Sequence, residues 1–208
     1  MILEIIRNSG DTDAEMRRLK ILVADDESII RMGLRTMLTA LGHEVVLASN
    51  GREALEFVRT ARPDLALLDI QMPLTDGLEA ARVIARKHPM PILILTAYGE
   101  QDLIEKAAQL PIQGYLVKPV NERDLAAAIQ VAVARFEDAQ AQARENAELK
   151  ESLEARKLVE RAKGVLMKTG LSEEEAYLAI QRQAREARVS MRQAAEAIIA
   201  QAQPKSPA

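Results

Sequence analysis

The feature that most constrains the fold is the stretch at residues 65–73, LALLDIQMP. It is a short apolar run that ends on an acid, Asp69, and is followed by a turn that closes with proline. A run of this length, bounded by a turn signal, is typical of a buried parallel strand. In open sheets of parallel strands, binding and chemistry gather beyond the carboxyl ends. The stretch therefore predicts that Asp69 lies where a functional site would form.

The same pattern recurs along the first two thirds of the chain. Apolar runs alternate with segments whose apolar residues recur at helical spacing. The first of these helices is expected to be capped by Ser28 and ended by Gly42. Strands are predicted at 21–24, 44–48, 65–69, 92–95 and 114–117, and further helices at 52–61, 76–87 and 101–109. Such alternation implies right-handed βαβ units, and therefore an α/β fold with a doubly wound, five-stranded parallel sheet covered by helices on both faces.

The pattern changes after Asn121, which is expected to cap the next helix. Residues 122–163 contain no glycine or proline and are dominated by good helix formers, which predicts one long helix leaving the first domain. Leu149 and Leu153 fit a heptad, but the same frame puts polar and charged residues at other core positions. A coiled coil and a solvated single helix therefore remain alternatives.

The end of the chain is predicted to be a small all-helical domain. Ser172 with Glu175, and Ser190 with Gln193, each have the spacing of a capping box. They indicate helices at about 173–187 and 191–201, preceded by the end of the long helix. We expect a flexible N-terminal tail (1–18), a sheet domain (19–136), a helical linker (137–155), a three-helix domain (156–201) and a disordered C-terminus (202–208).

Composition excludes several kinds of site. The chain has no cysteine and two histidines, which rules out disulfides, thiolate zinc sites and cysteine nucleophiles, and leaves little for a histidine-based metal site. Its formal net charge is −3, so no overall positive field draws it onto nucleic acid. No apolar run has the length of a membrane span, and the opening residues lack the pattern of a signal peptide. We expect a cytoplasmic protein that does not enter a membrane.

Polar residues follow four of the predicted strands. Asp25 and Asp26 follow the first strand, Asp69 ends the third, Thr96 the fourth, and Lys118 follows the fifth. Clustered carboxylates repel one another, and a hard cation with oxygen ligands, such as Mg²⁺, removes that cost. A carboxylate beside Mg²⁺, a hydroxyl and a lysine can attack phosphorus and carry the phosphoryl group. The strand ends therefore predict an aspartyl-phosphate site.

These motifs resemble the receiver domain of two-component response regulators. The resemblance covers residues 20–135, with the acidic pair in VADDE, Asp69 in LLDIQMP followed by Asp76 and Gly77, Thr96 in ILTA and Lys118 in GYLVKP. It implies a strand order of 2-1-3-4-5 and a cis proline candidate at Pro119. It also implies a sensor histidine kinase as the partner that phosphorylates Asp69, and a regulator rather than an enzyme.

The resemblance also implies roles for single residues. Asp26, Asp69 and the backbone carbonyl of Gln71 would hold Mg²⁺, with Asp25 assisting through water. Lys118 and Thr96 would contact the phosphoryl group. Tyr115 matches the aromatic switch, which would turn inward when Thr96 moves toward phosphate. The side chains of Gln71 and Tyr98 occupy positions that tune the lifetime of the phosphate.

Charges in the last part of the chain are balanced but sorted. Residues 137–208 contain twelve basic and twelve acidic residues. On the end of the long helix, Lys157, Arg161, Gly164 and Lys168 fall in one stripe, and Arg182 and Arg185 lie opposite the apolar face of the next helix. Such stripes suit phosphate contacts, although exposed basic residues are equally often only solvated. Gly164 weakens its helix, which is understandable if a ligand or another helix comes close there.

Residues 156–199 resemble the ANTAR domain. The resemblance rests on AKGVLM at residues 162–167, on Ala176 with Tyr177, and on Ala184, Met191 and Ala195. It implies RNA binding and transcription antitermination, in which the domain holds hairpins that overlap a terminator. Tyr177 is the candidate stacking residue, since RNA loops are read through unpaired bases, and a side chain at the edge of the core is the alternative role. The candidate RNA-binding residues are Lys157, Arg161, Lys163, Gly164, Lys168, Tyr177, Arg182 and Arg185.

The leading hypothesis is an RNA-binding antiterminator switched by phosphorylation. Phosphorylation at Asp69 would move the face built from residues 101–136, and the long helix would carry the signal to the last domain through dimerisation. The homodimer could form through the long helix or through that face. A DNA-binding regulator is the first alternative, disfavoured because no helix-turn-helix spacing is evident. A protein-interaction adaptor is the second, and the neutral charge of the last domain leaves it open.

Overall fold

The computed structural model describes residues 17–73, 75–97 and 110–202. The chain forms two compact units, and the boundary between them along the chain falls between Ala139 and Gln140. Several predictions concern residues outside the described part of the chain: the N-terminal tail up to residue 16, the helix at 101–109, Tyr98 and the C-terminus from residue 203. The predicted borders of the helical linker stay a prediction.

The first unit contains a five-stranded parallel sheet. Its strands are β1 Lys20–Ala24, β2 Glu44–Ala48, β3 Leu65–Asp69, β4 Ile92–Thr96 and β5 Gly114–Val117. Their order is β2-β1-β3-β4-β5, which confirms the doubly wound arrangement. The register pairs Ala24 with Leu68 and Asp69 with Leu95. The residues that follow β1 therefore lie level with Asp69 at the carboxyl edge of the sheet.

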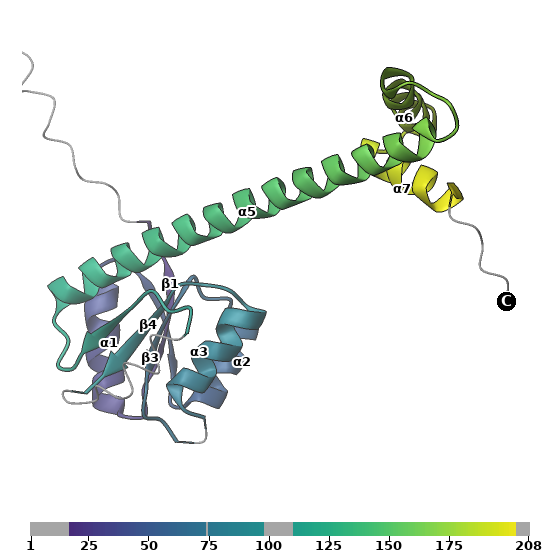
Figure 1. The fold of residues 1–208 in the computed structure, drawn as a ribbon. Helices are drawn as coiled ribbons and strands as arrows, with labels where there is room; N and C mark the ends of the chain where they lie inside the picture. The colour runs from purple at the N-terminus through teal and green to yellow at the C-terminus, as the bar shows by residue number, and fades with distance from the viewer. Residues whose placement is uncertain (1–16, 74, 98–109, 203–208) are drawn as a thin grey trace, which may run out of the picture. The chain divides into compact units, whose positions relative to one another are not determined.

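Helices cover both faces of this sheet (Figure 1). The helices of the first unit are α1 Ser28–Ala40, α2 Gly51–Ala61, α3 Gly77–Lys87 and the beginning of α5 Glu122–Met167. Leu38 of α1 and Ile129 of α5 pack into one core cluster, and Val58 of α2 and Ile84 of α3 into the other. All five residues of β3 are buried, as expected for a central strand with helices on both sides. Asp69 is therefore held at the end of a fully buried central strand.

The start of α1 differs from the prediction. Ser28 is the first helical residue and not the cap; Glu27 occupies the cap position and makes no side-chain cap hydrogen bond. Instead, the backbone N–H of Glu27 donates to Asp25 Oδ1 at 2.8 Å. The carboxylate of Asp25 thus orients the entry into α1, because it holds the backbone N–H of the residue at the cap position.

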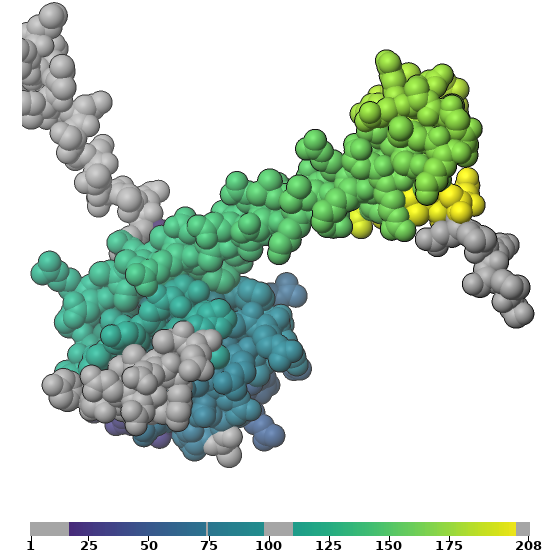
Figure 2. Space-filling view, in the orientation of Figure 1, coloured from purple at the N-terminus to yellow at the C-terminus, as the bar shows by residue number. Residues whose placement is uncertain are grey.

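The long helix is continuous, as predicted. α5 runs for 46 residues, and Asn121 caps it by accepting from the backbone N–H of Asp124 at 2.9 Å. Residues 141–154 are all exposed, including Leu149 and Leu153, which are 56% and 57% exposed. Figure 2 shows the side chains of α5 in teal to green. A solvated helix describes the single chain, and pairing of two such helices stays a prediction.

The second unit is a bundle of three helical segments. The last turns of α5 pack with α6 Glu173–Ala187 and α7 Met191–Ala202 around a core that includes Ala162, Ile180 and Ile198. Both predicted capping boxes are confirmed, with the hydroxyls of Ser172 and Ser190 accepting from the backbone N–H groups of Glu175 and Gln193. Among the described helices, none is both long and apolar enough to cross a membrane.

Candidate phosphoryl-acceptor site and RNA-binding surface

Three carboxylates converge at the carboxyl edge of the sheet. One oxygen from each of Asp25, Asp26 and Asp69 lies within 4.8 Å of the others. Asp25 is fully buried, Asp69 is 6% exposed, and Asp26 is exposed. The convergence follows from the topology, because β1 and β3 are neighbours although some forty residues separate the two strand ends. The predicted acidic cluster is therefore present.

Lys118 places a cation within this cluster. Its ammonium lies 2.7 Å from Asp25 Oδ2 and 2.7 Å from Asp69 Oδ1. Burial raises the pKa of Asp69, the ammonium of Lys118 opposes that change, and the carboxylates of Asp25 and Asp26 add to it. Burial alone would lower the pKa of Lys118, but its contacts with Asp25 and Asp69 raise it overall. The site therefore combines a carboxylate, Asp69, whose charged form is disfavoured by burial, with the ammonium of Lys118, which two carboxylates hold in place.

The other predicted residues of this site lie around the same edge. Thr96 ends β4 and is fully buried. Gln71 lies two residues beyond Asp69, with an exposed side chain in the loop after β3. Tyr115 of β5 is 52% exposed, so its ring faces outward in this structure. The peptide bond between Lys118 and Pro119 is cis, as the sequence suggested.

Two residues that support the site were not identified as such from the sequence. The guanidinium of Arg31 donates to the backbone carbonyls of Asp25 at 2.6 Å and Asp26 at 2.9 Å, and so braces the acidic pair. Gly77 opens α3 so close to β3 that an added Cβ would overlap the carbonyl oxygen of Asp69. The sequence shows only that Arg31 lies one helical turn after Glu27. Many surface arginines have such a spacing, so it does not identify Arg31 as a residue that supports the site.

The donor set fits a hard divalent cation. Carboxylate oxygens are the ligands that Mg²⁺ prefers, and water completes its coordination shell. Asp26 is the exposed member and faces water, while Asp25 and Asp69 are held by the sheet. One ammonium against three clustered carboxylates leaves an excess of negative charge that a divalent cation would neutralise.

The predicted basic stripe lies on the end of α5. Lys157, Arg161, Gly164 and Lys168 are all exposed. Lys157 forms an ion pair with Glu154 at 2.8 Å within the same helix. An added Cβ at Gly164 would find no atom within 4 Å among the described residues. Packing inside this unit therefore does not explain the glycine.

The residues predicted on α6 are also accessible. Arg182 and Arg185 are exposed, and Tyr177 is 46% exposed. Lys163 differs from the rest of the candidate set. It is 8% exposed, and its ammonium contacts Glu160 of α5 and Glu173 of α6.

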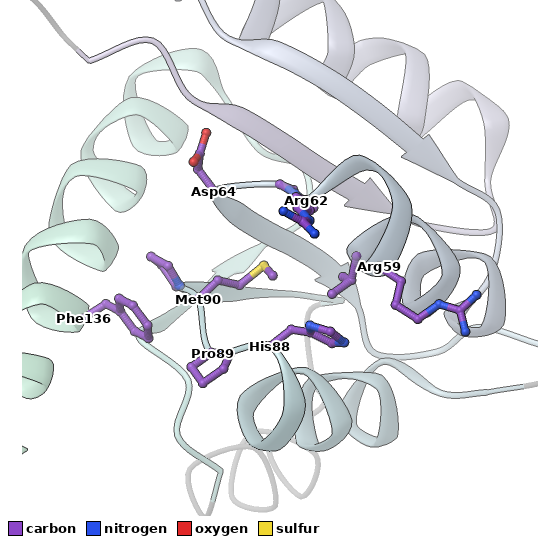
Figure 3. A pocket seen from close by; sticks show the side chains of 10 residues that line it. Arg59, Arg62, Asp64, His88, Pro89, Met90 and Phe136 are labelled. Carbon is purple, nitrogen blue, oxygen red and sulfur yellow. The ribbon is translucent and has the colours of Figure 1, made fainter.

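A cavity of about 620 Å³ lies in the first unit (Figure 3). Phe136 of α5 is on one side and Arg59 of α2 on the other, with Met90, Pro89 and His88 between them. Its lining comes from the end of α2 and from the segments before β3 and β4. None of the predicted site residues takes part in this cavity.

Comparisons with known proteins agree with both domains. Residues 21–130 match the response regulator receiver domain, and residues 147–199 match the ANTAR domain. The transcriptional regulatory protein PdtaR of Mycobacterium tuberculosis (strain ATCC 25618 / H37Rv) is 45% identical over 191 residues, which cover 91% of this chain and 93% of PdtaR. The probable transcriptional regulator ycf27 of Porphyra purpurea is 40% identical over 121 residues, covering 58% of this chain and half of that protein.

Solved structures match the first unit. A response regulator receiver domain protein from Clostridium thermocellum superposes with a TM-score of 0.53 and 36% identity, covering 57% of this chain and 96% of that one. The signal receiver domain of a modulated diguanylate cyclase from Desulfovibrio desulfuricans G20 gives a TM-score of 0.55 at 30% identity, covering 58% and 97%.

Proposed function

Because this chain belongs to the response regulators, with a receiver domain followed by an ANTAR domain that acts through RNA-binding antitermination, we propose that phosphorylation of Asp69 by a sensor histidine kinase controls its binding to RNA. The observation that carries the proposal is the meeting of Asp25, Asp26 and Asp69 with the ammonium of Lys118 at one edge of the sheet. The regulated step is the formation of a terminator hairpin in nascent RNA.

The chemistry at Asp69 is a phosphoryl transfer. A carboxylate oxygen of Asp69 forms a bond to phosphorus while the P–N bond to the kinase histidine breaks, and the electron pair leaves with the imidazole. Lys118 and Thr96 would contact the oxygens of the transferred group. Electrostatic repulsion opposes the approach of an anionic phosphoryl group to the carboxylate of Asp69. The ammonium of Lys118 reduces this repulsion.

Mg²⁺ would be held by Asp26, Asp69 and the backbone carbonyl of Gln71, with Asp25 assisting through water. When bound, it neutralises charge on the phosphoryl oxygens. The residues of the chain provide the rest: Arg31 and Gly77 fix the backbone of the acidic residues, and Tyr115 is positioned on β5 to respond when Thr96 moves.

A surface beside the site suits the kinase. Ile29 and Met32, in the first turns of α1, are 77% and 53% exposed. They follow directly on the acidic pair at the end of β1. Contiguous exposed apolar surface is typical of a site that a partner protein covers, and we assign this role to Ile29 and Met32. Such a partner would bring its phosphohistidine to Asp69.

The RNA surface is proposed to comprise the basic stripe of α5 and the exposed residues of α6. Four cations of this surface form no ion pair with the described residues: Arg161, Lys168, Arg182 and Arg185. They remain available to phosphates, and Tyr177 offers a ring for stacking on an unpaired base. Gly164 lets the RNA backbone approach the helix closely.

The place and assembly of the protein complete the proposal. The regulator acts in the cytoplasm, where nascent transcripts are, and it pairs through α5 or through the face built from residues 101–136. Phosphorylation would favour the pairing and thereby bring two RNA-binding domains to adjacent hairpins.

The function is tested by binding to a stem-loop RNA and to a duplex DNA at two salt concentrations, with and without acetyl phosphate. We expect tighter, salt-dependent binding to RNA after phosphorylation. The double variant Arg161→Ala, Lys168→Ala should lose most of it, whereas Arg82→Ala, Arg86→Ala on α3 removes the same charge and should not. Preference for the duplex DNA, or equal loss in both double variants, would contradict the proposal.

A further inference from the structure

Lys163 is a buried lysine of the second unit. It lies on α5 between Ala162, which is fully buried in the core of the second unit, and Gly164, which is exposed. The side chain of Lys163 is 10% exposed, whereas those of the glutamates it contacts, Glu160 and Glu173, are 60% and 70% exposed. The carboxylates therefore stand between the ammonium and solvent.

The hydrogen bonds of Lys163 are complete. Its ammonium donates to Glu160 Oε1 at 3.0 Å, to Glu160 Oε2 at 3.1 Å and to Glu173 Oε1 at 2.6 Å. A lysine ammonium has three N–H donors, and these three contacts are enough to occupy them. A phosphate that approached Lys163 would first meet two carboxylates, so the local charge opposes a direct contact.

The contact with Glu173 connects two helices. Glu160 belongs to the same helix as Lys163, but Glu173 is the first residue of α6. Glu173 and Tyr177 are four residues apart and therefore share one face of α6. The ion pair thus connects the end of α5 to the turn of α6 that precedes Tyr177.

We propose that Lys163 is a positioning residue for RNA binding, which ties α5 to the first turn of α6 and presents Tyr177, and that it does not contact RNA itself. The pKa of Lys163 is raised, mainly by the hydrogen bond that its ammonium donates to Glu173 and then by those it donates to Glu160, so the ammonium stays charged and the tie persists at neutral pH. This inference rests on the RNA-binding function proposed above and assigns a different role to one residue of the expected binding set.

Salt dependence separates positioning from contact. Each phosphate contact made by a cation contributes about one to the slope of the logarithm of the binding constant against the logarithm of the salt concentration. With a stem-loop RNA selected in vitro against the wild-type chain, Lys163→Met should weaken binding several-fold and leave this slope unchanged. A slope that falls by about one in Lys163→Met would overturn the proposal.

Glu173 gives a second test with the opposite sign. If Lys163 bound RNA, Glu173→Gln would free the lysine and tighten binding. Positioning predicts that Glu173→Gln weakens binding, although it removes a negative charge. Glu174→Gln is the matched control, since it removes the same charge from the next residue, which forms no ion pair with the described residues. Equal tightening in both glutamine variants would contradict the proposal.

The rate of backbone hydrogen exchange reports, without RNA, whether the ion pair between Lys163 and Glu173 stabilises the first turn of α6. In the full chain, the backbone amides of residues 175–177 should exchange faster in Lys163→Met and Glu173→Gln than in the wild type or in Glu174→Gln. Unchanged exchange rates would overturn the claim that this ion pair holds α6 to α5. Failure to select any RNA with the wild-type chain would instead overturn the RNA-binding function, so the two failures are distinguishable.

Discussion

The ammonium of Lys118 lies 2.7 Å from Asp25 and 2.7 Å from Asp69, so one cation contacts two of the three clustered carboxylates. The third carboxylate, Asp26, is exposed and lies within the same 4.8 Å cluster. The site therefore keeps an excess of negative charge, which destabilises the fold until a cation neutralises it.

Removal of the Asp26 charge should stabilise the receiver domain without metal. Two unit charges a little under 5 Å apart near a surface repel by about 1 kcal/mol when water screens them fully, and more when it does not. In EDTA, Asp26→Asn should raise the free energy of unfolding by about 1 kcal/mol. It should also reduce the stabilisation by Mg²⁺, which would otherwise reach about 2.7 kcal/mol at a hundredfold excess over the dissociation constant.

Urea unfolding in EDTA and in Mg²⁺ measures both effects. Asp138→Asn, an exposed carboxylate on α5 outside the cluster, is the control for a general change in charge. An Asp26→Asn variant that is less stable than the wild type in EDTA, or that keeps the full effect of Mg²⁺, would show that the clustered charge is not the cause.

Two glycines should respond to alanine with opposite signs. At Gly77 an added Cβ would overlap the backbone carbonyl of Asp69, so Gly77→Ala should cost roughly 1–3 kcal/mol through overpacking and should slow phosphorylation. At Gly33, in the middle of α1, the Cβ meets nothing within 4 Å, so Gly33→Ala should stabilise by about 0.5–1 kcal/mol. Chemical unfolding of both variants and their rate of phosphorylation by acetyl phosphate test this. A Gly77→Ala variant with unchanged stability would contradict it.

Gly164 should separate stability from binding. Gly164→Ala removes a weak position from α5 and adds a methyl group into open space, so the second unit should gain about 0.5–1 kcal/mol in thermal unfolding. If RNA approaches the helix there, the same methyl group should weaken RNA binding by about tenfold, corresponding to about 1.4 kcal/mol. A variant that is more stable and binds RNA as well as the wild type would remove Gly164 from the binding surface.

The sequence predicts most of the fold because its signals are local and strong. The five apolar runs match the five strands, and the absence of glycine and proline after Asn121 matches the continuous α5. The capping boxes at Ser172 and Ser190 placed the helices of the second unit within a residue or two. The residues of the acidic cluster could be predicted because parallel strands bring their ends to one edge.

Other features depend on contacts that no local pattern records. Ser28 looked like a helix cap, but the carboxylate of Asp25 already orients that turn. Arg31 braces the acidic pair through backbone carbonyls, and such bonds leave no trace in residue type. In the sequence, Lys163 looks like its basic neighbours. Only the fold shows that Glu173, ten residues further along the chain, contacts its ammonium.

The central claim is that Asp69 accepts the phosphoryl group, and intact-mass spectrometry tests it most directly. After incubation with acetyl phosphate and Mg²⁺, the wild-type chain should gain the mass of one phosphoryl group. Asp69→Asn should gain none while its circular dichroism stays that of the folded protein. A phosphoryl group on folded Asp69→Asn, or none on the wild-type chain with acetyl phosphate or with a phosphorylated kinase, would contradict the account.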